Sequence, residues 1–373
     1  MINVLITGDF CPRNRIEDLV LQKEFSNIYN DFLPLIKEAD ISITNLECPL
    51  IDKGTKIKKT GPNLKAPQNA IDALTYGGFN IVTLANNHIM DYGDEGLVAT
   101  LKSCKSNGIE FVGVGSNLNE ARKPLYKTIN GITLAIVNFC ENEFSTTSSN
   151  AMGANPLNPI LNYYDIKETK LKAQYVFVII HGGHEYYSLP SPRMQEAYRF
   201  FIDAGADAVI GHHIHCFSGY ELYQNKPIFY SLGNFIFDAK KKRESEWNKG
   251  YAVKFTLNET SISFSLHPYI QGDGAPGVKL MNKFEEEKFK NEITQLNDEI
   301  NDSKILEAKF KEFITSSKKK YFSYIQPYTN KYLLALYKRG LIPSIISRQN
   351  KRILQNICRC EAHRDVLIEI LKE

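Results

Sequence analysis

The stretch VFVIIHGGHE, residues 176–185, decides the fold of this chain. Its first five residues make the most apolar of the strand-like runs, and a short run rich in β-branched residues is typical of a strand buried on both faces. Two histidines and a glutamate follow directly. We therefore expect a central strand of a sheet whose carboxyl end carries functional side chains.

Strand-like and helix-like patterns alternate around this stretch over about the first 275 residues. Helical spacing is found over residues 16–38, and Asn130-Gly131 has the composition of a hairpin turn. Further strands are expected at residues 4–6, 41–43, 81–84, 208–210 and, antiparallel, between 219 and 267. We predict an α/β fold: a β-sandwich of two sheets flanked by helices, with a helical extension at the C-terminus.

The composition changes after residue 277, so we place a first domain at residues 1–277 and a helical extension at residues 278–373. Lys and Glu are dense in the extension at helical spacing, which favours a solvated helical face packed on one side. The alternative is that the extension contacts a membrane surface or an acidic polymer through Lys318–Lys320, Tyr321, Phe322 and Tyr324.

The net charge and the distribution of apolar residues exclude some classes of binding partner. The formal net charge of +3 is too small to favour nucleic acid, and no stretch approaches the ~20 apolar residues of a membrane span. The N-terminus has no basic leader followed by an apolar run and a cleavage site, and the seven cysteines are scattered. We expect a cytoplasmic protein that is at most peripheral to a membrane.

Six of the eight histidines lie in three short segments, each directly after an apolar run. Polar clusters follow five strand-like runs in the same way: Gly8-Asp9, Asn45-Leu46-Glu47, Asn86-Asn87-His88, His181–Glu185 and Gly211–His215. Because ligands bind at the carboxyl ends of strands in α/β sheets, we expect these side chains to converge. A mixed set of nitrogen and oxygen ligands suits Zn²⁺, Mn²⁺ or Fe²⁺.

Each cluster alone also has a purely structural explanation. Asp9 or Glu47 could cap a helix or form a turn, the Asn86–His88 triplet could be a turn, and His181 could be a satisfied core histidine. The segment His212–His215 is different, because three imidazoles in four residues are hard to place without a ligand. Together the clusters favour a metal site over five separate structural roles.

With these residues in view, the chain resembles the CapA family of poly-γ-glutamate capsule synthesis proteins, a branch of the calcineurin-like metallophosphoesterase superfamily. The resemblance covers about residues 2–240 and excludes the helical extension. It is carried by Gly8-Asp9, Asn45-Leu46-Glu47, Ala85–His88 with Asp91-Tyr92-Gly93, His181–Tyr186, Gly205-Ala206-Asp207, Gly211–His215 and Tyr230–Phe235. It implies the calcineurin-like metallophosphoesterase fold.

The resemblance also implies roles for single residues. It implies two divalent metal ions (Mn, Zn or Fe), held by Asp9, Glu47, Asn87, His181, His213 and His215. His88 would be the catalytic residue that stabilises the leaving group. In an extended chain the side chains of His213 and His215 share a face and His212 points away. Supporting or substrate-binding roles fall to Asn45, Asp91, Glu185, His212 and Asn234.

Two departures from the family pattern bear on the metal site. The superfamily's first motif is Asp-x-His, but its third position here is Cys11, which we interpret as an inert small side chain rather than a thiolate ligand. The family's usual His-Trp-Gly is His181-Gly182-Gly183 here, so an aromatic wall is missing. One metal position is therefore expected to be weaker.

Three hypotheses on function follow. The first is a metal-dependent, phosphoesterase-like hydrolase in capsule or surface-polymer synthesis, acting on a phosphoester or a γ-glutamyl amide. The second is a non-catalytic accessory protein that binds an anionic polymer or precursor within a synthase complex, which the missing imidazole favours. The third is a purely structural metal, against which the six candidate ligands argue.

Overall fold

The computed structural model describes residues 1–373 except 60, 329 and 360–373. The chain divides into two compact units, of which the first is Met1–Glu307 and the second begins at Ala308. Within the described residues, no helix has the length and the apolar character needed to cross a membrane.

The first unit contains two large sheets. The larger has the order β16 (Val278–Leu280), β15 (Ile262–Gln271), β14 (Lys249–Leu257), β1 (Ile2–Phe10), β2 (Ile41–Leu46), β3 (Ile81–Thr83) and β4 (Glu110–Val112), with β13 (Asn234–Ile236) also paired to β1. The other has the order β11 (Tyr220–Tyr223), β12 (Lys226–Phe229), β10 (Ala208–His212), β9 (Tyr175–His181), β7 (Ile132–Cys140) and β6 (Leu125–Ile129).

The strands that carry the polar clusters are parallel within each sheet. β1 is parallel to β2 and β13, and β2 is parallel to β3. β9 is parallel to both β7 and β10. A small additional sheet pairs β5 (Val114–Gly115) with β8 (Gly153–Ala154).

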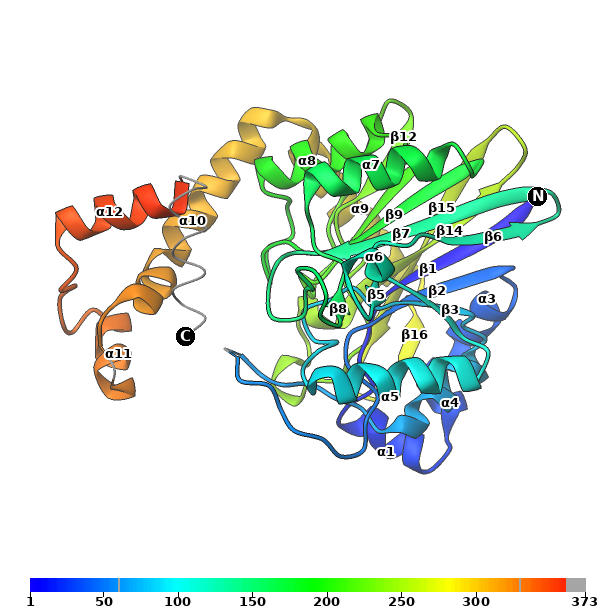
Figure 1. Ribbon diagram of the computed structural model, residues 1–373, viewed down its shortest axis with the longest axis horizontal. Helices are drawn as coiled ribbons and strands as arrows, with labels where there is room; N and C mark the ends of the chain where they lie inside the picture. The colour runs from blue at the N-terminus through cyan, green and yellow to red at the C-terminus, as the bar shows by residue number, and fades with distance from the viewer. Residues whose placement is uncertain (60, 329, 360–373) are drawn as a thin grey trace. The chain divides into compact units, whose positions relative to one another are not determined.

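Helices cover the outer face of each sheet (Figure 1). The larger sheet is covered by α1 (Arg15–Leu21), α2 (Phe25–Tyr29), α3 (Leu33–Lys37), α4 (Ile71–Gly77) and α5 (Gly93–Ser106). The other is covered by α7 (Pro159–Lys170) and α8 (Pro192–Asp203). Shorter helices are η1 (Asn30–Phe32), η2 (Gln68–Ala70), α6 (Leu118–Ala121), η3 (Lys240–Lys242) and η4 (Glu246–Asn248).

The side chains of strand β9 are buried on both faces of its sheet. Phe177 and Ile179 pack between the two sheets, whereas Val176, Val178 and Ile180 pack under the outer helices. The alternation follows from the two-residue repeat of a strand, and each fully buried aliphatic side chain contributes about 2 kcal/mol to folding. The predicted two-sheet sandwich flanked by helices, with a central apolar strand, is thus confirmed.

Two finer predictions have different outcomes. Residues 16–38 form several short helices rather than one, because Lys23 and Asn30 adopt positive φ angles that interrupt the helix. The Asn130-Gly131 hairpin turn is confirmed, since it joins the antiparallel strands β6 and β7 and both residues have positive φ.

The first compact unit extends past residue 277. β16 pairs with β15, and Phe289 and Ile293 of α9 (Lys283–Asn301) pack into the core between the sheets. Compactness therefore divides the chain after Glu307, whereas a family domain at residues 1–277 stays a prediction. The remaining helices are α10 (Ser303–Ile325), α11 (Lys331–Lys338) and α12 (Arg348–Arg359).

Candidate metal centre

Strand register places the polar clusters side by side. Asp9 at the end of β1 lies opposite Asn45 of β2 and Asn234 of β13. In the other sheet, His181 and His212 lie opposite each other at the ends of β9 and β10. Contacts between Asp9 and the histidines join the carboxyl ends of the two sheets, as the sequence predicts.

An irregularity in β1 allows Asp9 to take this position. The register with β2 shifts between Ile6 and Asp9, and the Asp9 N–H donates to the Gly233 carbonyl over 3.1 Å. A Cβ atom on Gly8 would lie 1.9 Å from that carbonyl oxygen. Glycine is therefore needed at position 8 for the close approach of the two backbones.

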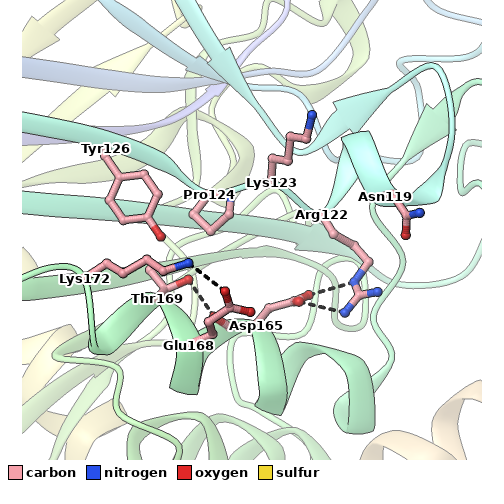
Figure 2. Close-up of a pocket in the computed structure, with 9 residues that line it drawn as sticks. All are labelled: Asn119, Arg122, Lys123, Pro124, Tyr126, Asp165, Glu168, Thr169 and Lys172. Atoms are coloured by element: carbon pink, nitrogen blue, oxygen red, sulfur yellow. Dashed lines mark hydrogen bonds and ion pairs between the residues drawn. The ribbon is translucent and has the colours of Figure 1, made fainter.

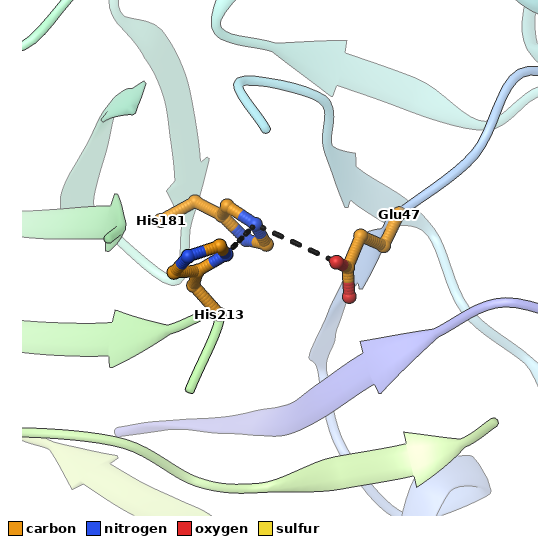
Figure 3. Close-up of side chains that lie close together, drawn as sticks. All are labelled: Glu47, His181 and His213. Atoms are coloured by element: carbon orange, nitrogen blue, oxygen red, sulfur yellow. Dashed lines mark hydrogen bonds and ion pairs between the residues drawn. The ribbon is translucent and has the colours of Figure 1, made fainter. Parts of the chain in front are cut away.

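One group of potential metal ligands consists of Glu47, His181 and His213 (Figure 3). His181 Nε2 lies 3.1 Å from His213 Nδ1 and 3.7 Å from Glu47 Oε1. The Asn87 amide oxygen lies 3.0 Å from the same nitrogen. Imidazole nitrogens, a carboxylate and an amide oxygen thus meet in one small buried volume.

A second group consists of Asp9, Glu47 and His215. His215 Nε2 lies 3.8 Å from Glu47 Oε1, and His215 Nδ1 lies 3.9 Å from Asp9 Oδ2. In each group the potential ligand atoms lie within 4.8 Å of one another, and all the residues are buried. Glu47 is the member that both groups share.

The surroundings of the Glu47 carboxylate indicate whether cations fit the two groups of ligands. Neither of its oxygens has a hydrogen-bond partner among the described residues. Burial, followed by the charge of Asp9, raises the pKa of Glu47 well above its usual value. A buried carboxylate without donors is costly, and a cation held by it would remove that cost. The residues therefore fit a bound cation on each side of Glu47.

The surroundings of His181 and His215 favour the neutral imidazole, which is the form that binds a metal. Burial, and then the neighbouring His213, hold the pKa of His181 well below its usual range. Burial lowers the pKa of His215 to about 4. Burial alone would raise the pKa of Asp9, but the neighbouring His212, whose Nδ1 lies 3.3 Å from Asp9 Oδ1, brings it below the usual range. Neutral imidazoles beside an ionised carboxylate match a cation site.

The His212–His215 segment is not extended, contrary to the sequence-based expectation. β10 ends at His212, and His213 and His215 have φ angles of +94° and +61°, respectively. His212 does not point away from the cluster, because its Nδ1 lies 3.3 Å from Asp9 Oδ1. Positive φ is rare for such residues, and backbone strain of this kind concentrates at functional sites.

His88 lies in a hydrogen-bonded set that includes a lysine. Its Nδ1 lies 2.7 Å from Asp91 Oδ2 and 3.2 Å from Lys59 Nζ. Lys59 pairs with the other Asp91 oxygen, and its side chain is 2% exposed. Because a lysine ammonium has no acceptor, the His88 Nδ1–H donates its hydrogen bond to the Asp91 carboxylate, which leaves Nε2 for a ligand. Burial lowers the pKa of His88, although Asp91 opposes that shift.

The predicted supporting residues differ in their contacts. Asn45 Nδ2 donates to Asp9 Oδ1 over 2.7 Å and lies 3.1 Å from His181 Nδ1. Asn234 Oδ1 lies 2.9 Å from His215 Nδ1. Glu185 is exposed, and its contribution among the described residues is electrostatic: its negative charge helps to raise the pKa of Glu47. Asn45 and Asn234 therefore orient ligands directly.

Cys11 is buried and lies near Cys48. Burial, and then the hydrogen bond with Cys48, raise the pKa of Cys11 well above its usual value. The thiol is therefore protonated at neutral pH and is a poor metal ligand, since metals bind the thiolate.

Sequence reasoning missed Lys59 and Glu143. Lys59 comes from the loop before η2, where its only sequence signal is a lysine-rich composition. Glu143 accepts a hydrogen bond from Asn87 Nδ2 over 3.4 Å and lines a cavity of about 350 Å³. One lining residue of this cavity thus contacts a proposed metal ligand. It is lined by Glu141, Asn142, Glu143, Leu157, Pro159 and Arg193.

A larger cavity of about 480 Å³ includes none of the candidate site residues (Figure 2). Arg122 donates to both oxygens of Asp165 there, over 2.9 and 2.7 Å, and Lys172 pairs with Glu168. Lys123 pairs with Glu120. Each cation on this cavity thus has a carboxylate partner, so the cavity offers no uncompensated charge to a ligand. Its lining residues are Asn119, Arg122, Lys123, Pro124, Tyr126, Asp165, Glu168, Thr169 and Lys172.

Comparison with solved structures gives only distant similarities. A hypothetical protein from Thermus thermophilus is 14% identical, with a TM-score of 0.45 over 75% of this chain and 100% of that chain. A phosphatase from Mycoplasma pneumoniae is 14% identical, with a TM-score of 0.47 over 73% of this chain and 95% of that chain.

Sequence comparison is more specific. The capsule biosynthesis protein CapA of Bacillus anthracis is 30% identical over 246 residues, which cover 64% of this chain and 60% of that protein. The PGA biosynthesis protein CapA of Bacillus subtilis (strain 168) is 32% identical over 242 residues, which cover 64% of each chain. The chain thus spans less than two thirds of the length of these relatives. A family model, "Bacterial capsule synthesis protein PGA_cap", matches residues 3–239. This chain belongs to the bacterial capsule synthesis protein PGA_cap family.

Proposed function

We propose that this protein is a metal-dependent hydrolase of the phosphoesterase type that acts in the synthesis of a capsule or another surface polymer. The observation that carries the proposal is the pair of ligand groups that share Glu47, whose oxygens have no hydrogen-bond partner among the described residues. A carboxylate shared between a group with two imidazoles and a group with one imidazole and a second carboxylate is an arrangement suited to a pair of divalent cations.

The two groups assign the ligands. Asp9, Glu47 and His215 would hold one cation. Glu47, His181 and His213, with the Asn87 amide oxygen, would hold the other. The donor set of nitrogen and oxygen suits Mn²⁺, Zn²⁺ or Fe²⁺. Bound there, such cations supply Lewis-acid polarisation of a phosphoryl or carbonyl oxygen and activation of water at neutral pH.

The chain's own residues supply positioning and proton handling. Asp91 accepts the Nδ1 proton of His88, so that Nε2 is the nitrogen available to a leaving oxygen. Lys59 pairs with the other oxygen of Asp91, so this buried carboxylate has a cationic partner. Asn45 and Asn234 hold Asp9 and His215 in orientation.

The biological context comes from the relatives. Two of them are named as capsule or PGA biosynthesis proteins, and two Mycobacterium tuberculosis relatives, 26% identical over 212 residues, as probable polyglutamine synthesis accessory proteins. We infer a substrate that is an anionic small molecule or polymer, either a phosphoester or a γ-glutamyl amide. We place the protein in the cytoplasm, peripheral to the membrane and in contact with a surface-polymer synthase complex.

Hydrolysis of an activated phosphoester tests the proposal. Purified protein loaded with Mn²⁺ should release p-nitrophenol from bis-p-nitrophenyl phosphate or p-nitrophenyl phosphate. The His88→Ala variant should lose about 10²- to 10⁴-fold in rate, the typical range for one acid–base group, while it retains its metal. Absence of turnover in folded, metal-loaded protein on phosphoesters and on γ-glutamyl anilide would contradict the proposal.

A second candidate function is supported by Cys11. This protonated, buried thiol stands where the superfamily has an imidazole, so the Asp9 side of the centre has fewer ligands. That reduction suits a protein that binds an anionic polymer or precursor within a synthesis complex without turning it over. Poly-γ-glutamate binding that survives His88→Ala, together with no hydrolysis, would favour this accessory function.

A further inference from the structure

The second compact unit has a very uneven charge. In its full extent, residues 308–373, it contains fourteen Lys or Arg residues and five acidic residues. Within it, residues 308–359, here called the basic helical unit, contain twelve Lys or Arg residues and one acidic residue, Glu312. The full chain has 45 basic and 42 acidic residues, so the remainder is net acidic. The positive charge of this protein is therefore concentrated in one small part of it.

The positive charges of the unit lie on the surface of its helices. Lys318–Lys320 belong to the C-terminal half of α10, and Lys338 and Arg339 end α11. α12 contributes Arg348 and Arg352, which are exposed. Five acidic residues in the whole of the second unit cannot neutralise its fourteen basic residues, so the unit presents a strongly positive field.

The same unit exposes apolar side chains. Tyr332 is 69% exposed, Leu341 67%, Ile345 55% and Ile353 50%. Among its described side chains only Ser323, Gln326 and Ile346 are buried. The unit thus has almost no apolar core of its own, and exposed apolar groups in this number mark an interaction surface.

Polar contacts join the segment that follows α10 to the segment that precedes α12. Gln326 Nε2 donates to Ser344 Oγ over 2.8 Å, and the Gln326 side-chain oxygen accepts from the Ile345 N–H. The Tyr328 hydroxyl donates to the Pro343 carbonyl over 2.7 Å. The aliphatic side chains of Leu341, Ile345 and Ile353 take no part in these bonds and are exposed.

We propose that the basic helical unit (α10 from Ala308, α11 and α12; Figure 1) is a binding surface for a membrane rich in anionic lipids. A soluble acidic polymer would neutralise the charges of the lysines and arginines, but it would leave the aliphatic side chains exposed to water. A bilayer surface satisfies both, since its headgroups are negative and its acyl boundary is apolar. The inference does not depend on the catalytic proposal.

Vesicle co-sedimentation of the full-length chain tests the inference. The protein should bind vesicles that contain phosphatidylglycerol, should bind vesicles of phosphatidylcholine alone far more weakly, and should be released at high salt. The triple variant Lys318→Gln, Lys319→Gln, Lys320→Gln should bind roughly 100-fold more weakly, since each basic residue at the surface adds about a factor of five. The chain offers a matched control: Lys240–Lys242, a second run of three lysines in the first unit, should tolerate the same changes.

The apolar contribution has its own pair of variants. Leu341→Ser should weaken vesicle binding by roughly tenfold. Leu171→Ser, at a position 84% exposed in the first unit, should leave binding unchanged. Circular dichroism should show unchanged helix content in each variant. No binding at low salt, binding lost in the Lys240–Lys242 variant alone, or binding to poly-glutamate but not to vesicles would overturn the inference.

Discussion

The two ligand groups of the metal centre share Glu47 but differ in composition. The His181 group has two imidazoles and the Asn87 amide besides the shared carboxylate. The Asp9 group has one carboxylate and one imidazole besides it, and the nearby Cys11 is a buried, protonated thiol and therefore a poor metal ligand. We infer that the two sides bind cations with different affinity, the His181 side more tightly, although one carboxylate joins them.

Removal of the shared residue should have the largest effect. Glu47→Ala should abolish binding at both sides, because each group loses a ligand. Cation present at about 100 times its Kd stabilises a protein by about 2.7 kcal/mol, so the wild type should gain this stability on metal addition and the variant should not. Calorimetric titration and thermal unfolding measure both effects. Glu168→Ala is the control and should behave as wild type, because this exposed glutamate lines the larger cavity, which includes none of the candidate site residues.

Removal of a ligand from one side should separate the two groups. His213→Ala should eliminate the tight cation, and His215→Ala should eliminate the weak cation while leaving the tight one. Metal analysis after dialysis against increasing chelator concentrations would show the difference. If both variants lost all their metal equally, the two ligand groups would not bind their cations separately, and the interpretation would be contradicted.

The pH dependence of stability should report the buried imidazoles in metal-free protein. Burial lowers the pKa of His215 from 6.5 to about 4. Between these values the unfolded chain binds a proton that the folded chain does not, so stability present above pH 6.5 is lost as the pH falls toward 4. This histidine alone accounts for up to about 3 kcal/mol. Urea unfolding at stepped pH should show the decline, and His215→Gln should reduce its slope.

Loss of an orienting residue should have a smaller and one-sided effect. Asn234→Ala removes the partner of His215 Nδ1 and should weaken the Asp9-side cation by about 10- to 100-fold. The His181-side cation should retain its affinity. A variant that weakened both sides equally would show that Asn234 supports the fold rather than one ligand.

The smallest effect is expected at Cys11. Because its thiol is protonated and buried, Cys11→Ala should leave metal content and cation affinity unchanged. Isothermal titration with Mn²⁺ and Zn²⁺ would check this. A marked loss of Zn²⁺ affinity would identify the sulfur as a ligand and would make the two sides more alike.

Sequence patterns predicted the sheets well because their signal is local. The apolar run at 176–180 is buried on both faces, and its carboxyl end lies where parallel strands place ligands. The residues proposed as ligands are all brought together, since each closely follows a strand in the sheets. What the sequence could not give was the backbone path after the strands: His213 and His215 have positive φ, and His212 contacts Asp9 instead of pointing away.

Other features depend on contacts between distant parts of the chain. Lys59 reaches Asp91 from a loop whose residues show no periodicity, and nothing in its own neighbourhood marks it as buried. Helix α9 has the Lys- and Glu-rich composition of a solvated extension, yet Phe289 and Ile293 fill the space between the sheets. In both cases a contact with a distant part of the chain determines what the residue does, and the local sequence does not predict that contact.

Electron paramagnetic resonance of the protein loaded with Mn²⁺ tests the central claim most directly. If Glu47 joins two cation sites, the fully loaded wild type should give the spectrum of a spin-coupled Mn²⁺ pair, and Glu47→Ala should not. A spectrum of isolated Mn²⁺ ions at full loading, or the same spectrum with and without Glu47, would contradict it.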